Sequence, residues 1–145
     1  MKCVEKMPHN HADKLVPLGL LDEILAAIAE TQGNAWEGLH KALQAALEAR
    51  GWQREARVAP PLKTRFDAFK DSIAVEIEFG LRDYAFREWT YFEKAHVAGL
   101  VTAGVHIVRC KPGDSANCSA KWARATLQSF SDVFSVPVLI LGVDL

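Results

Sequence analysis

Two short apolar segments near the end of the chain constrain its fold more than any other feature. They run from Gly104 to Cys110 (GVHIVRC) and from Val136 to Val143 (VPVLILGV). Apolar residues at almost every position are typical of strands that are covered on both faces. Residues 115–130 between them have helical periodicity, and a strand–helix–strand unit crosses over right-handed and leaves its strands parallel. The pattern predicts an α/β protein with helices on both sides of a sheet.

The rest of the chain adds helices and a run of consecutive strands. Apolar residues recur first at helical spacing and then at every second position, with turn residues between the segments. We expect helices at residues 17–30, 35–50 and 82–100, and strands at residues 53–58, 63–69 and 72–79. Three strands in sequence favour an antiparallel meander, so the central β-sheet is predicted to be mixed and flanked by α-helices.

The length of the chain limits its organisation. A sequence of 145 residues has room for one well-formed hydrophobic core. We therefore predict a single domain over residues 1–145, in which the polar residues 1–15 form a frayed N-terminus.

Charge and cysteine content bear on the class of protein. Lys and Arg number 17 and Asp and Glu 18, which is not the basic excess typical of nucleic-acid-binding domains, although bases gathered on one face would still allow DNA binding. Cys3, Cys110 and Cys118 lack metal-ligand spacing and are predicted to be reduced thiols. No apolar run approaches the ~20 residues that span a bilayer, and no leader pattern is seen. We expect a cytoplasmic protein without membrane contacts.

The strand expected at residues 72–79 carries two acids on one face. Its odd positions are apolar, whereas Glu76 and Glu78 occupy even positions. Since side chains alternate between the faces of a strand, both carboxylates project from the same side of the sheet.

A third acid is predicted to join this face from the preceding strand. A two-residue turn at Lys70–Asp71 puts Asp67 opposite Ala74 and diagonally next to Glu76. Three carboxylates on one face repel each other unless a cation neutralises them, and Mg²⁺ is the simplest ion with a preference for oxygen ligands. Such an ion is what phosphodiester hydrolysis requires.

The same pairing has an alternative interpretation. It places Arg65 opposite Glu76 and Lys63 opposite Glu78, so the face could be an ordinary solvated surface with cross-strand ion pairs. A central strand followed by crossover helices should be covered on both sides, which favours acids that line a cleft. The two interpretations are separated by whether the carboxylates converge around a space and whether Arg65 fills it.

An Asp followed nine positions later by Glu-x-Glu resembles the restriction-endonuclease-like superfamily, whose pattern is Asp, a spacer and (Asp/Glu)-x-Lys. More narrowly, VEIEFG, a helix with an aromatic-rich centre (YFEKAHVAGL) and then GVHIV resemble the BglII and BamHI type of restriction endonuclease, in which the usual lysine is replaced. The element order agrees over about residues 35–143. The resemblance implies a type II restriction-endonuclease-like enzyme that hydrolyses DNA with Mg²⁺, or with Mn²⁺ in its place, and that acts as a homodimer.

The resemblance also implies roles for particular residues. Asp67 and Glu76 would bind the metal, the carbonyl of Ile77 would complete its shell, and Glu78 would orient or deprotonate the attacking water. Related enzymes often place another acid on the helix before the first strand, where Glu37 stands in AWEGLHKAL. The alternative for Glu37 is a first-turn acid that the helix dipole favours.

Candidate DNA contacts lie on the helix after Gly80. Tyr84, Arg87, Tyr91 and Lys94 follow 3-4-3 spacing and share one helix face, on which cations alternate with aromatic rings. Such a face, together with Arg65, can contact a phosphodiester backbone. A solvated helix flank is the alternative.

Three functions are therefore compared. The first is the metal-dependent DNA endonuclease. The second is a nuclease-derived module that binds nucleic acid or protein without cutting, which the retention of all three acids disfavours. The third is an unrelated α/β protein whose acids form surface ion pairs and which has no affinity for metal.

Overall fold

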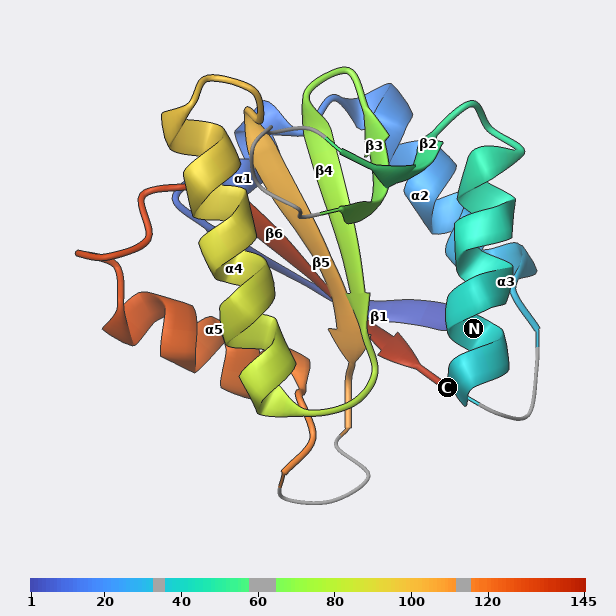
Figure 1. Ribbon diagram of the computed structural model, residues 1–145. Coiled ribbons are helices and arrows are strands. Elements are labelled where there is room, and N and C mark those ends of the chain that lie inside the picture. Colours follow the sequence, from blue (N-terminus) through green and yellow to red (C-terminus); the bar gives the residue numbers. More distant parts are fainter. Residues whose placement is uncertain (33–35, 58–64, 112–115) are drawn as a thin grey trace.

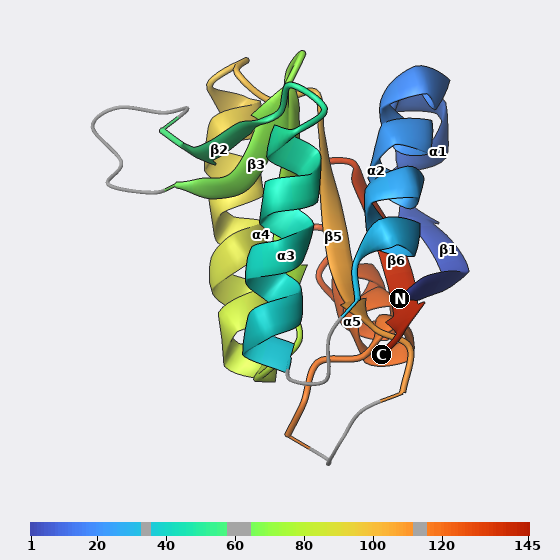
Figure 2. The ribbon, with the colours of Figure 1, turned by 90° about the vertical axis from the view of Figure 1, so that its right-hand side faces the viewer.

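The computed structural model describes residues 1–32, 36–57, 65–111 and 116–145. A mixed sheet lies at the centre, with helices on both faces (Figures 1 and 2). The elements are β1 (Lys2–His9), α1 (Ala12–Leu15), α2 (Leu18–Glu30), α3 (Trp36–Glu48), β2 (Gln53–Ala56), β3 (Phe66–Lys70), β4 (Ile73–Glu78), α4 (Arg82–Val97), β5 (Ala103–Arg109), α5 (Ala120–Ser129) and β6 (Val138–Asp144).

The six strands of the sheet have the order β1-β6-β5-β4-β3-β2. The central strands β4, β5 and β6 are parallel, as the crossover pattern predicted. The strands β1, β3 and β2 pair antiparallel toward the two edges. The predicted fold class, a mixed sheet flanked by helices, is confirmed.

Two hydrophobic cores lie on opposite faces of the sheet. α1 and α2 cover one face, α3 packs beside α2 near β2 and β3, and α4 and α5 cover the other face (Figure 2). We call the core under α1 and α2 the first core and the core under α4 and α5 the second core. On β4, Ile73, Val75 and Ile77 belong to the first core, whereas Ala74 belongs to the second. Even positions of β4 therefore face α4, which fixes the side on which Glu76 and Glu78 lie.

The β3–β4 hairpin turns one residue later than expected. Asp71 and Ser72 have φ angles of 48° and 64°, which is the pair of left-handed conformations that a two-residue type I′ turn requires. Lys70 pairs with Ile73, and continuing this register puts Asp67 opposite Glu76 instead of Ala74. The predicted partner of Asp67 is wrong. The predicted face is right, because the pairing moved by two residues and side-chain parity was kept.

The N-terminus is not frayed. β1 pairs with β6 along its length, with a bulge between Cys3 and Glu5. The bulge lets Met1 and Cys3 pack on one core and Met7 on the other. β1 looks polar in the sequence because it is an edge strand, in which exposed lysines and Pro8 are tolerated.

Two helices are shorter than expected. α4 ends at Val97. Two residues later, Gly99 adopts a left-handed φ of 72° and its N–H donates to the carbonyl of His96, which closes the end of the helix. α5 begins at Ala120, after Ser119 accepts a hydrogen bond from the backbone N–H of Trp122. Part of the segment predicted as its first turn lies outside the described residues.

A half-buried lysine ties α2 to the β-hairpin. Lys70 Nζ donates to both carboxylate oxygens of Glu23, at 2.9 and 2.8 Å, and to the carbonyl of Arg50 at 2.8 Å. The indole N–H of Trp52 donates to Glu23 at 2.8 Å. The cluster joins α2, the end of α3 and β3.

We expect Lys70→Met to lower the free energy of unfolding by about 1–3 kcal/mol, because the acceptors in this cluster lose a charged donor. Urea denaturation measures this change. Lys121→Met, on the exposed surface of α5, is the matched control and should change the free energy by less than about 0.5 kcal/mol. Equal effects of the two substitutions would contradict the role of the cluster.

Candidate active site

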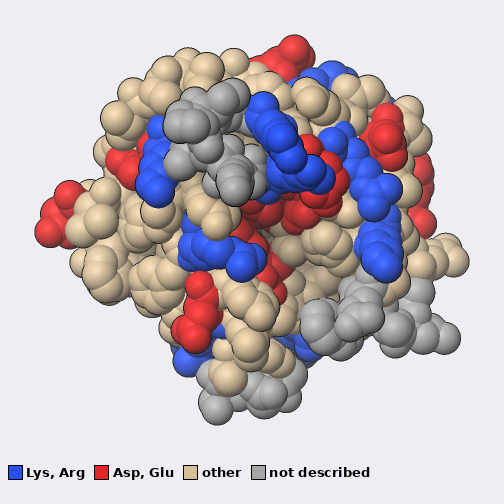
Figure 3. Space-filling model, in the orientation of Figure 1, with Lys and Arg blue, Asp and Glu red and all other residues tan. Residues whose placement is uncertain are grey.

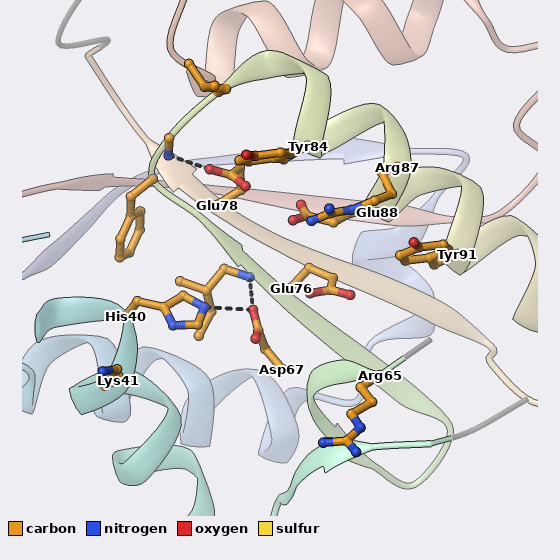
Figure 4. A pocket seen from close by; sticks show the side chains of 14 residues that line it. His40, Lys41, Arg65, Asp67, Glu76, Glu78, Tyr84, Arg87, Glu88 and Tyr91 are labelled. Carbon is orange, nitrogen blue, oxygen red and sulfur yellow. Dashed lines mark hydrogen bonds and ion pairs between the residues drawn. The ribbon is translucent and has the colours of Figure 1, made fainter. Parts of the chain in front are cut away.

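A cleft of about 820 Å³ opens on the α4 side of the sheet (Figure 4). α3 lies along one side of it, α4 along the other, and β3 and β4 between them. Its lining consists of His40 and Lys41 from α3, Arg65 and Asp67 at β3, residues 76–78 of β4, residues 79–81, and Tyr84, Arg87, Glu88 and Tyr91 from α4. The three acids predicted from the sequence, Asp67, Glu76 and Glu78, all reach this cleft.

Asp67 is held in place by three hydrogen bonds. Its Oδ2 accepts from His40 Nε2 at 3.1 Å and from the backbone N–H of Ile77 at 2.8 Å, and its Oδ1 accepts from Gln44 at 2.7 Å. The bond to Asp67 raises the pKa of His40. His40 and Gln44 are one turn apart on α3, so this helix face fixes the carboxylate in the cleft.

Glu76 and Glu78 are almost fully buried, with 5% and 7% of each residue exposed. Burial, followed by the charges of Glu88 and Asp67, raises the pKa of Glu76 well above its usual value. Burial and the charge of Glu88 raise the pKa of Glu78 to about 7, although the carboxylate also accepts a hydrogen bond from the backbone N–H of Gly80. Both carboxylates are therefore costly to ionise in the metal-free protein.

A fourth acid, Glu88, also lines the cleft and was not predicted. It lies on α4, with 6% of its surface exposed, and burial and the charge of Asp67 raise its pKa to about 8. Glu88 Oε2 is 3.0 Å from His106 Nε2 on β5, at ion-pair distance but without the alignment of a hydrogen bond. The indole N–H of Trp89 donates to His106 Nδ1 at 3.0 Å.

The signal for Glu88 was present in the sequence. Glu88 stands between Ala85, Trp89 and Phe92, which all pack in the second core. A carboxylate inside an apolar helix stripe is exceptional, since buried acids require a partner. His40 and Gln44 gave no such signal, because their function depends on where α3 lies against β3.

The donor set of the cleft fits a divalent cation. Carboxylate oxygens are the ligands that Mg²⁺ prefers. Burial, and after it the repulsion between the acids, raises the pKa values of Glu76, Glu78 and Glu88, and a cation relieves this repulsion. Within the described residues, no three His, Cys, Asp or Glu side chains already form a metal-binding group. Mg²⁺ does not need one, because it keeps several waters and usually binds one or two carboxylates.

The ion-pair alternative is not supported at Arg65. Arg65 Nη1 lies 3.7 Å from Glu55 Oε2, and its side chain points away from Glu76 (Figure 4). Arg65 therefore lines the cleft without filling the space between the acids. The other predicted partner, Lys63, lies outside the described residues.

The rim of the cleft is basic and aromatic. Tyr84, Arg87 and Tyr91 line it as one face of α4, and the Arg87 guanidinium stacks over the Tyr84 ring at 4.8 Å. Lys94, on the same predicted face, is exposed but does not line the cleft. Lys41 lines it from α3 and was not predicted. In Figure 3, basic side chains surround an acidic hollow.

Two predicted metal ligands remain predictions. Ile77 directs its backbone N–H toward Asp67, and its carbonyl should face the same side of β4, because the N–H and C=O of one strand residue point the same way. Glu37 lies in the first turn of α3, but its side chain is outside the described part of the chain.

Acids on the floor of a cleft, cations on its rim and a mixed sheet beneath define a nuclease of the restriction-endonuclease-like class. The sequence matches the model of the family described as restriction endonuclease BglII/BglIII over residues 5–143. The chain belongs to this family. It is therefore a DNA-hydrolysing endonuclease, of a family that uses divalent metal ions.

Two solved structures are similar to this fold. One is a crystal structure of restriction endonuclease BglII complexed with a DNA 16-mer, with a TM-score of 0.86 and 18% identity over 98% of this chain and 76% of that chain. The other is a crystal structure of free BglII, with a TM-score of 0.77 and 19% identity over 100% of this chain and 80% of that chain. A comparison with curated proteins finds no match. No helix in the described residues is long and apolar enough to cross a bilayer.

Proposed function

We propose that this cleft cuts DNA with Mg²⁺, and that Asp67, Glu76 and Glu78 carry the reaction. The observation that supports the proposal is that these three acids, from two adjacent strands, reach one cleft with a basic rim. Asp67 and Glu76 would hold the ion, and the carbonyl of Ile77 would face it. When bound, Mg²⁺ would lower the pKa of a coordinated water and neutralise negative charge on the phosphate. Mn²⁺ prefers similar oxygen ligands and would serve in its place.

Glu78 would orient the attacking water. One of its oxygens accepts from the backbone N–H of Gly80, which fixes the carboxylate on the cleft floor. A pKa of about 7 before metal binds is near the value that suits a general base. Neutralisation by the bound cation would lower that pKa, so orientation is the role that the geometry supports best.

The rim would hold the DNA backbone, as the protein in one similar structure is bound to a DNA 16-mer. Tyr84, Arg87, Tyr91 and Arg65 surround the acidic floor, so phosphates held by the rim would be brought to the acids. Two copies of the chain would address the two strands, which makes a homodimer the expected assembly. Three free cysteines agree with a cytoplasmic location.

We expect Arg87→Gln to weaken DNA binding about tenfold, since a hydrogen bond to a charged group contributes roughly 1.5 kcal/mol. The slope of log K against log salt should fall by about 1, because one phosphate contact is lost. Fluorescence anisotropy with a duplex oligonucleotide in EDTA measures both quantities. Lys94→Gln, outside the cleft, is the matched control and should have the smaller effect. If Lys94→Gln has the larger effect, the assigned rim is wrong.

Incubation of supercoiled plasmid with the protein in Mg²⁺ or in EDTA tests the proposed function. We expect open-circular and linear DNA in Mg²⁺ and intact plasmid in EDTA. Metal-independent nicking would contradict the proposal. Binding without cutting, in Mg²⁺ and in Mn²⁺, would instead identify a nuclease-derived binding module. Sedimentation at several concentrations tests the homodimer.

A further inference from the structure

Glu55 is an exposed acid in an unusual backbone conformation. It lies in β2, at the edge of the sheet, and its φ of 51° is in the left-handed region. Residues that carry a Cβ rarely adopt this region, because it is sterically costly. Such strain persists where the surrounding structure fixes it, and it is concentrated at functional sites. The conformation of Glu55 therefore requires a reason beyond the pairing of β2 with β3.

The sheet places Glu55 opposite Asp67, which is proposed to bind the metal ion. The register pairs each neighbour of Glu55 on β2 with the corresponding neighbour of Asp67 on β3, so the two acids stand across from each other. Like charges at opposite positions of two strands destabilise the pair. A donor that both carboxylates share would relieve this repulsion.

Gln44 on α3 is that donor. Its Nε2 donates to Asp67 Oδ1 at 2.7 Å and to Glu55 Oε1 at 3.3 Å. An amide nitrogen carries two hydrogens, and each of these two bonds uses one of them. Only 2% of Gln44 is exposed. The amide is therefore fixed between the two carboxylates.

The other oxygen of Glu55 is directed to the rim of the cleft. Glu55 Oε2 lies 3.7 Å from Arg65 Nη1, and the side chains of both residues are about half exposed. Arg65 lines the cleft (Figure 4). Such an exposed ion pair contributes little to stability, so a DNA phosphate can replace Glu55 as the partner of Arg65. One carboxylate thus contacts both the residue that holds Asp67 and a cation of the rim.

We propose that Glu55 is a positioning residue of the active site, which keeps Asp67 in one orientation through Gln44. The inference rests on the proposed function, in which Asp67 binds the metal ion. Without the acceptor on Glu55, the Gln44 amide can turn about its remaining bond, and the carboxylate of Asp67 is held less firmly. The loss of an outer partner of a metal ligand weakens metal binding by roughly 10–100-fold.

Glu55→Gly tests the proposal, because glycine removes the carboxylate and also relieves the strain. We expect Mn²⁺ to bind the full chain about tenfold more weakly, in a titration without DNA that follows free Mn²⁺ by electron paramagnetic resonance. The thermal midpoint in EDTA should equal or exceed that of the wild type, since the left-handed region is not costly for glycine. Unchanged Mn²⁺ affinity would overturn the inference. A fall in both stability and affinity would also overturn it, because it would indicate a purely structural role.

Two further variants separate the hydrogen bond from strain and charge. Glu55→Gln keeps an oxygen that can accept from Gln44, and it should restore most of the Mn²⁺ affinity. If Glu55→Gln binds Mn²⁺ as weakly as Glu55→Gly, the charge of Glu55 acts and not its hydrogen bond, and the inference fails. Asp71→Gly is the matched control. Asp71 is an exposed acid with a left-handed φ of 48°, away from the residues that line the cleft, and its replacement should leave the Mn²⁺ affinity unchanged.

DNA binding in EDTA distinguishes lost positioning from general damage to the cleft. Glu55→Gly releases Arg65 from its carboxylate partner, so a duplex oligonucleotide should bind at least as tightly as it binds the wild type. Fluorescence anisotropy measures this affinity. Weaker binding of both DNA and Mn²⁺ by Glu55→Gly would overturn the inference.

Asp67→Asn separates this inference from the proposed function. We expect Asp67→Asn to lose Mn²⁺ binding together with plasmid cleavage. If Asp67→Asn binds Mn²⁺ and cuts as the wild type does, the proposed function fails. If Asp67→Asn loses both while Glu55→Gly binds Mn²⁺ as tightly as the wild type, only the further inference fails.

Discussion

Replacement of Asp67 by asparagine is expected to lower the rate of plasmid cleavage about a thousandfold and to leave the fold intact. The carboxylate lies where it would bind the cation, and a metal ion contributes several kcal/mol of transition-state stabilisation, at about 1.4 kcal/mol for each factor of ten. Initial rates of conversion of supercoiled plasmid in Mg²⁺ measure the effect.

The hydrogen bonds of Asp67 make this substitution specific for charge. An asparagine oxygen can still accept from His40 and from the N–H of Ile77. Its amide would then face Gln44, whose own amide can rotate to present an oxygen, at the cost of the 3.3 Å hydrogen bond from Gln44 Nε2 to the exposed carboxylate of Glu55. The circular dichroism spectrum should therefore match that of the wild type. Asp83→Asn, away from the cleft, is the control, and a wild-type rate for Asp67→Asn would exclude Asp67 as a metal ligand.

The sheet was predictable because its signals are local. Continuous apolar runs identified β5 and β6 as covered strands, and alternation identified the two faces of β4. The register of the β3–β4 hairpin could not be predicted from the sequence. Lys70–Asp71 and Asp71–Ser72 are both acceptable turn sequences, and only the backbone conformation distinguishes them. β1 was missed because its pairing partner β6 is at the other end of the chain.

In the candidate site, the residues from strands were predictable from the sequence and the residues from helices were not. Strand parity brings Asp67, Glu76 and Glu78 to one face whichever two-residue turn is chosen. Contributions from helices were not predictable, because a helical period identifies the buried stripe but not the strand residues that the stripe meets. His40 reaches Asp67, and Glu88 reaches the cleft, only through the packing of α3 and α4 on the sheet.

A second large effect is expected on thermal stability. Most substitutions of buried residues destabilise a protein, whereas this one should stabilise it. Glu78→Gln should raise the thermal midpoint of the metal-free protein at pH 8, although it removes a residue proposed to act in catalysis. Burial and Glu88 raise the pKa of Glu78 to about 7, above the ordinary value near 4.5. Between these values the folded chain holds a proton that the unfolded chain has lost, so wild-type stability falls as pH rises from 4.5 to 7.

Above pH 7 the whole destabilisation by Glu78 is present, and the neutral amide of Glu78→Gln avoids it. We expect a rise of a few degrees at pH 8, given that 1 kcal/mol shifts the midpoint of a domain of this size by roughly 3–5 °C. The difference should shrink toward pH 5, where the wild-type carboxyl group is protonated in the folded state. Calorimetry in EDTA at both pH values measures this change.

Mg²⁺ should stabilise the wild type more than it stabilises Glu78→Gln. A cation that binds only the folded chain stabilises it in proportion to its affinity, and the wild type retains the charged ligands that bind it. At pH 8 saturating Mg²⁺ should therefore raise the midpoint of the wild type more than that of Glu78→Gln. If Glu78→Gln is less stable than the wild type in EDTA at pH 8, the buried carboxylates do not oppose folding, and the electrostatic case for a cation in this cleft is lost.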